Sequence, residues 1–146
     1  MAVMRERLLY VYPGVNKAGV GLVVLTGREV TASAVGSIPM HEVAQLSERF
    51  NPSDVIVPPG QDTIYRSRPF RATFGSLRVV RPGWQANRSK RRFPLRDAYN
   101  LGPLAQNAWA MMSYEIMSDR SLKMRSWNMS LLSREWLEAN SIRRLS

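Results

Sequence analysis

The sequence contains no cysteine and a single histidine, His41. A chain without cysteine forms neither a disulfide nor a thiolate metal site, and one histidine cannot build an all-imidazole metal site. We expect His41 at the surface or at a helix start, because a lone histidine without a nucleophile signature is weak evidence for a catalytic triad. No apolar run approaches the roughly 20 residues of a membrane-crossing helix. We therefore expect no membrane partner and an intracellular location, in the cytoplasm, the nucleoid or an organellar matrix.

Acidic residues are also scarce. Eleven Asp and Glu stand against 21 Lys and Arg, which gives the 146 residues a formal net charge of +10. A chain this basic usually meets a polyanion, because each Lys or Arg near a phosphate releases condensed counterions. Nucleic acid, either DNA or RNA, is the expected partner. An acidic protein, a membrane surface or a basic surface without any polyanionic target are the alternatives.

The first third of the chain predicts strands. Apolar residues run from 8 to 12 and again from 22 to 25, and a turn at Pro13-Gly14 separates the two runs. A third run with strand composition, residues 29–35, would pair next. Because β-branched and aromatic residues fit a pleated surface and Pro-Gly interrupts it, we expect a three-strand meander.

A helix and two further strands should follow the meander. Pro39 suits the first turn of a helix that ends before Asn51-Pro52, with Val43, Leu46 and Phe50 as its buried stripe. Residues 54–57 predict a buried strand, which a helical crossover allows to lie parallel to the first. Residues 77–80 predict a fifth strand.

A basic insertion covers residues 61–96. From 63 to 96 there is no acidic residue, and aromatic residues are interleaved with the basic ones. Arginine grips phosphate in a fork, and aromatic rings can stack on unpaired bases. We expect phosphate contacts from Lys17, Arg66, Arg68, Arg71, Arg88, Lys90, Arg91, Arg92 and Arg96. Trp84 is the best candidate for stacking, although each aromatic could equally pack the core beneath a solvated loop.

Two helical patterns close the chain. Gly102-Pro103 begins the first, whose apolar stripe consists of Ala105, Ala108, Trp109, Met112 and Ile116. The second is an amphipathic segment made of Met129, Leu132, Trp136 and Ala139, with Ser130 as its expected N-cap. We expect a domain over residues 1–117 and a C-terminal helical extension over residues 118–146. The extension could dock on a partner or close the core.

The order of strand, strand, strand, helix, strand, strand and helix resembles the ribonuclease H-like fold, an α/β fold with a mixed sheet. Within that fold, residues 12–21, YPGVNKAGVG, are similar to the strand, Pro-Gly turn and glycine-containing second strand that open RuvC-type Holliday junction resolvases. A second similarity lies in Val80-Arg81-Pro82-Gly83-Trp84, Ser89-Lys90, Phe93-Pro94 and the small-residue helix from 102 to 112. The resemblance covers residues 8–117 and would imply a homodimer.

The departures from this family concern its metal site. Members that cut DNA hold two divalent metals with four carboxylates. This chain has Tyr12 at the first position, Pro58 and Pro59 at the second, and neutral amides near the last pair: Asn100, Gln106 and Asn107. Asp62 and Asp97 alone remain nearby. The resemblance therefore implies a nuclease-derived protein that binds structured DNA or RNA, with no catalytic residue, no metal and no cofactor.

Two other functions stay open. One is a basic structural subunit of a large assembly, such as a ribosome or a phage particle, whose loops and tail become ordered on RNA or on neighbouring chains. The other is an active metal-dependent junction nuclease that holds Mg²⁺ with Asp54, Asp62 and Asp97.

Overall fold

The computed structural model describes residues 5–27, 29–60, 77–80, 102–118 and 129–140. These residues form a mixed α/β fold around one six-stranded sheet with the strand order β5-β4-β1-β2-β3-β6. The strands are β1 (Arg5–Pro13), β2 (Lys17–Thr26), β3 (Glu29–Pro39), β4 (Asp54–Val57), β5 (Leu77–Val79) and β6 (Met129–Leu131). The helices are the short 3₁₀ helix η1 (Met40–Glu42), α1 (Val43–Phe50), α4 (Gly102–Ser118) and α5 (Arg134–Asn140).

The sheet confirms the predicted meander and the parallel crossover. β2 is antiparallel to both β1 and β3, which makes the three-strand meander. The crossover through α1 places β4 parallel to β1, and β5 then adds parallel to β4. No helix within the described ranges has the length and apolar character needed to cross a membrane.

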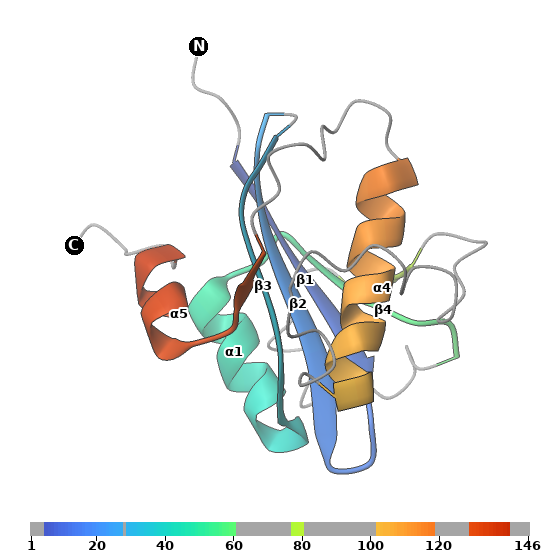
Figure 1. Ribbon diagram of the computed structural model, residues 1–146. Helices are drawn as coiled ribbons and strands as arrows, with labels where there is room; N and C mark the ends of the chain where they lie inside the picture. Colours follow the sequence, from blue (N-terminus) through green and yellow to red (C-terminus); the bar gives the residue numbers. More distant parts are fainter. Residues whose placement is uncertain (1–4, 28, 61–76, 81–101, 119–128, 141–146) are drawn as a thin grey trace.

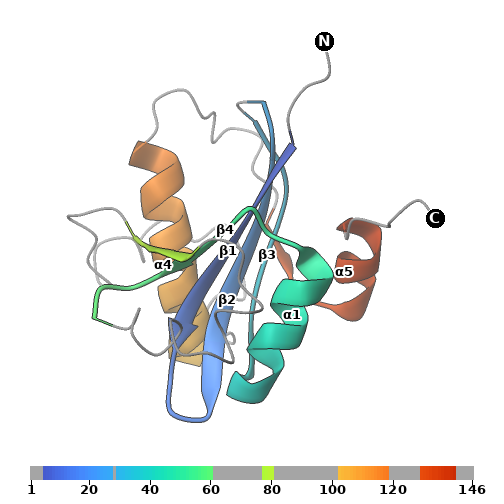
Figure 2. The same ribbon diagram turned by 180° about the vertical axis from the view of Figure 1, so that it is seen from behind.

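Helices cover both faces of the sheet. α4 lies on one face, and α1 and α5 lie together on the other (Figures 1 and 2). Successive residues of β1 point to opposite faces, as the pleat requires. Leu8 and Tyr10 join the core beneath α4, whereas Leu9 and Val11 join the core beneath α1 and α5. The predicted stripe of α4 is confirmed, because all five of its residues are buried.

Glycine lets α4 approach the sheet closely. A Cβ atom at Gly19 would collide with the backbone carbonyl of Leu104 and would come within 2.8 Å of the amide nitrogen of Ala105. At Gly21 a Cβ would meet the flexible Met112 side chain, with its sulfur at 3.1 Å. The glycines of β2 therefore set the distance between the sheet and the helix.

The predicted start of the first helix is wrong. β3 continues to Pro39, because residues 37–39 stay paired with the first residues of β2, and the helical turns begin only at Met40. The predicted end is confirmed. Asn51 adopts a left-handed conformation with φ of 52° and donates its backbone N–H to the Ser47 carbonyl at 2.8 Å. The stripe Val43, Leu46 and Phe50 is buried, as predicted.

The expected helix over residues 129–139 is also wrong in its first part. Residues 129–131 form strand β6, parallel to β3, because the open edge of β3 offers backbone hydrogen bonds to an extended segment. Ser133, not Ser130, caps the helix: its Oγ accepts the backbone N–H of Trp136 at 3.0 Å. Leu137 is buried and the ring of Trp136 lies 6.1 Å from that of Phe50, so this segment closes the core. Ala139 is exposed.

Candidate nucleic-acid interface

One edge of the sheet gathers the carboxyl ends of three parallel strands. β1, β4 and β5 run in the same direction and end at Pro13, Val57 and Val79. The β1–β2 turn lies at this edge, and Leu104 in the first turn of α4 packs against it, since a Cβ at Gly14 would meet the Leu104 side chain at 2.8 Å. The first turn of α4, the β1–β2 turn and the ends of β4 and β5 therefore share what we call the carboxyl edge.

Lys17 is the one predicted phosphate contact within the described residues. It begins β2 at the carboxyl edge, and its side chain is exposed. The turn before it is closed by a hydrogen bond of 2.8 Å from the Gly14 N–H to the Lys17 carbonyl. The Asn16 carbonyl accepts the N–H of Met40 at 2.9 Å, which ties the turn to the start of η1. The backbone of this turn is therefore held from two sides, and the lysine projects from a fixed base.

The other predicted contacts lie outside the described residues. These are Arg66, Arg68, Arg71, Trp84, Arg88, Lys90, Arg91, Arg92 and Arg96. The described chain shows where their segments are attached. Residues 61–76 follow the end of β4, and residues 81–101 connect the end of β5 to the start of α4. The end of β4, the end of β5 and the start of α4 lie at the carboxyl edge. The fourth attachment point is the start of β5.

Basic residues are concentrated in the segments between β4 and α4. Within the described ranges, six Lys and Arg stand against eight Asp and Glu, which is a formal charge of −2. The remaining residues carry 15 Lys and Arg against three Asp and Glu, a formal charge of +12. Nine of those 15 basic residues belong to the segments 61–76 and 81–101. Their only acidic residues are Asp62 and Asp97, so these two segments together have a formal charge of +7.

Other side chains stand at the positions where the resembled family bears metal-binding carboxylates. Tyr12 is half-buried and packs against the core beneath α4, Pro58 is buried, and Gln106 and Asn107 lie half-buried near the start of α4. Asp62, Asp97 and Asn100 lie outside the described residues. Asp54 begins β4, at the opposite end of that strand from Pro58. Within the described ranges no three His, Cys, Asp or Glu side chains are grouped so that they could hold a metal ion.

A buried polar cluster, which the sequence analysis missed, joins β1, β5 and α4. Glu115 is 4% exposed and receives two hydrogen bonds from the Arg78 guanidinium, at 2.7 and 2.8 Å. The Tyr10 hydroxyl donates to the same carboxylate at 2.9 Å. Asp54 lies on the other side of Arg78, 3.7 Å from its Nε. The sequence did contain one indication of this cluster: Glu115 is the only charged residue of α4, and a lone charge in an otherwise uncharged helix suggests a paired, buried side chain.

The electrostatics of this cluster are those of a structural ion pair. Burial raises the pKa of Tyr10 well above its usual value, and the negative charge of Glu115 raises it further. The hydrogen bonds with Glu115 raise the pKa of Arg78. Tyr10 therefore keeps its proton and Arg78 keeps its charge at neutral pH. Arg78 belongs to the basic stretch of the sequence, but its guanidinium is committed to Glu115 and Asp54 rather than free to meet a phosphate.

Arg7, near the start of β1, is only 5% exposed. Its Nη1 donates to the Phe50 carbonyl at 3.1 Å, and its guanidinium lies 5.5 Å from the centre of the Phe50 ring. A cation beside the last carbonyls of a helix is favourable. Arg7 therefore fastens the end of α1 to β1 and does not face a ligand.

No family model matches the chain, and no curated protein sequence matches it significantly.

Proposed function

We propose that this chain is a non-catalytic nucleic-acid-binding protein, with a ribonuclease H-like core that resembles a RuvC-type resolvase without its metal-binding carboxylates. The element order supports the fold assignment. An antiparallel meander is followed by a crossover helix, two strands parallel to β1 and then a long helix on the opposite face. This is the order on which the sequence resemblance rests.

The observation that carries the proposal is the concentration of basic residues between β4 and α4. Residues 61–76 and 81–101 carry nine Lys and Arg against two Asp, a formal charge of +7, and they are attached at or beside the carboxyl edge. Basic residues concentrated in segments that are attached near exposed Lys17 suit a phosphate backbone, because binding there releases counterions from several phosphates at once.

Binding without cleavage is inferred from the residues that replace the family's carboxylates. Tyr12 carries a phenol, a poor ligand for Mg²⁺ beside a carboxylate. Pro58 has no ligating side-chain atom, and the amides Gln106 and Asn107 carry no charge to offset a divalent ion. These residues leave the carboxyl edge suited to positioning phosphates rather than to activating water.

The test is a titration of the full chain against duplex DNA, a four-way DNA junction and single-stranded RNA, read by fluorescence anisotropy. Salt should be varied from about 50 to 200 mM, because the slope of log K against log salt reports the number of phosphates neutralised. We expect binding that weakens steeply with salt, and no cleavage when Mg²⁺ is added. The ligand bound most tightly would define whether DNA or RNA is the natural target.

A variant with Arg88, Lys90, Arg91 and Arg92 all changed to glutamine should make the salt slope on duplex DNA shallower by about 3. The matched control is the double variant Arg49→Gln and Arg134→Gln, which removes exposed arginines from the two helices on the opposite face of the sheet from α4 and should leave the slope unchanged. Equal effects of both variants would contradict a localised interface. Absence of binding at low salt would overturn the proposed function, and Mg²⁺-dependent cutting would overturn its non-catalytic part.

A further inference from the structure

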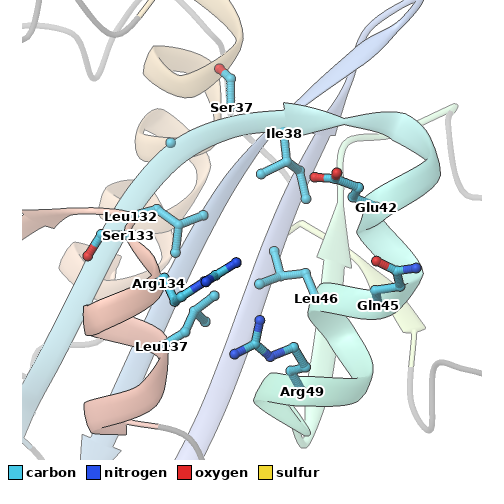
Figure 3. Close-up of a pocket in the computed structure, with 11 residues that line it drawn as sticks. Ser37, Ile38, Glu42, Gln45, Leu46, Arg49, Leu132, Ser133, Arg134 and Leu137 are labelled. Atoms are coloured by element: carbon cyan, nitrogen blue, oxygen red, sulfur yellow. The ribbon is translucent and has the colours of Figure 1, made fainter.

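A pocket lies on the opposite side of the sheet from α4, between α1 and α5 (Figure 3). It has a volume of about 290 Å³. Its apolar wall is formed by Ile38 from β3, Leu46 from α1 and Leu137 from α5, with Leu132 from the segment between β6 and α5. The pocket does not contain any residue of the carboxyl edge.

Two arginines enter this pocket from different helices. Arg49 comes from the last turn of α1 and Arg134 from the first residue of α5. Figure 3 shows both guanidinium groups directed into the space between the two helices. Both side chains are exposed, and neither has a hydrogen-bond or ion-pair partner among the residues that the structure describes. Two converging cations repel one another, so this end of the pocket favours a negatively charged group between them.

The backbone that carries Arg134 is firmly held. The Leu132 N–H donates to the Val35 carbonyl at 2.9 Å, which continues the pairing of β6 with β3. Ser133 then caps α5 and fixes the direction of its first turn. A Cβ at Gly36 would lie only 2.9 Å from the Leu132 Cβ, so this segment packs directly on β3. The pocket wall is therefore formed before any ligand arrives, which lowers the entropic cost of binding.

We propose that this pocket binds a small organic anion, with an oxyanion headgroup held by Arg49 and Arg134 and a short aliphatic body on the leucine wall. Arginine presents a planar fork of donors that matches a carboxylate or a phosphate. The volume is at the lower limit of small-molecule sites, and the lining contains no aromatic residue on which a base could stack. Glu42 lies at the other end of the pocket in Figure 3, so a second negative group on the ligand is disfavoured there.

The test is a methyl NMR titration of the full chain with three probes of equal chain length: hexanoate, hexyl phosphate and uncharged hexanol. We expect saturable shifts of the Leu46, Leu132 and Leu137 methyl signals with at least one of the anions. Hexanol should cause only weak, unsaturated shifts. A response to hexanoate alone or to hexyl phosphate alone supports the site and names its headgroup.

Arg49→Gln and Arg134→Gln should each weaken binding of the responding anion by at least about tenfold, since each removes a charge-assisted hydrogen-bond donor. The Arg→Lys variants keep the charge but lose the fork, and should weaken it less. Lys17→Gln removes an equal charge at the carboxyl edge and should leave the affinity of this pocket unchanged. Methyl spectra of the free variants check that the fold is intact.

Three results would overturn the proposal: no saturable shift with either anion, hexanol binding as tightly as the anions, or unchanged affinity in both glutamine variants. These results are independent of nucleic-acid binding, which is measured with other ligands and is expected to survive both arginine substitutions.

Discussion

The hydroxyl of Tyr10 donates a hydrogen bond of 2.9 Å to the Glu115 carboxylate, across 105 positions of the sequence. Tyr10 is 1% exposed and lies in β1, near the centre of the sheet, while Glu115 lies in the last turns of α4. Arg78 of β5 completes the cluster from the sheet side. One carboxylate thus connects the central strand, the edge strand and the helix that covers them.

Removal of the Tyr10 hydroxyl should destabilise the fold modestly. Tyr10→Phe keeps the ring and loses one hydrogen bond to a charged acceptor, so we expect the free energy of unfolding to fall by about 1.5 kcal/mol. Urea denaturation followed by circular dichroism measures this. Glu115→Gln should cost more, because it leaves the Arg78 guanidinium without its carboxylate. A Tyr10→Phe variant as stable as the parent would show that this hydrogen bond contributes nothing net.

Alkaline pH should also destabilise the protein through Tyr10. Its pKa is raised in the folded state, so the stabilising effect of the protonated phenol is complete below the ordinary tyrosine pKa of about 10. Above that pH the unfolded chain loses this proton while the folded chain keeps it, so stability falls as pH rises toward the folded pKa. Denaturation between about pH 9 and pH 11 should show this fall, and Tyr10→Phe should show less of it. Parallel pH profiles for the two proteins would contradict the assignment.

Gly19→Ala should be markedly more harmful than Gly21→Ala. The new methyl group at Gly19 meets the backbone of α4, which can yield only by moving the whole helix, so we expect a loss of about 3 kcal/mol. At Gly21 the neighbour is the flexible Met112 side chain, and the loss should be about 1 kcal/mol. Thermal or urea unfolding of the two variants gives the comparison. Equal losses would mean that α4 does not approach β2 as closely as the structure has it.

A serine pair tests the start of α5. Ser133→Ala removes the side-chain oxygen that accepts the Trp136 N–H, so it should lower stability by about 1 kcal/mol. Ser130→Ala, at an exposed position of β6, is the matched control and should change stability by less than about 0.5 kcal/mol. The reverse order would favour a helix that begins near Ser130.

Local patterns predicted much of the fold because they encode which side of each element is buried. Apolar runs bounded by turn residues were sufficient for β1, β2, β4 and β5, and helical spacing was sufficient for the stripe of α4. The parallel crossover followed from the element order. They failed at Pro39 and at residues 129–131, where pairing with a neighbouring strand overrode the local preference. Of the predicted interface, only Lys17 falls within the described residues, where it lies exposed at the carboxyl edge, and its contact with phosphate stays a prediction.

The sequence by itself determined the charge of +10, the concentration of nine of the 21 Lys and Arg in residues 61–76 and 81–101, and the amides and prolines where the resembled family carries carboxylates. Tertiary structure alone decided the partners of the arginines. Arg7 is buried beside Phe50, and Arg78 pairs with Glu115. Arg49 and Arg134 line the same pocket. The sequence alone does not distinguish the environments of these four arginines. Such pairings depend on which elements pack together, and residues 37 or 85 positions apart meet only after the sheet and its covering helices have formed.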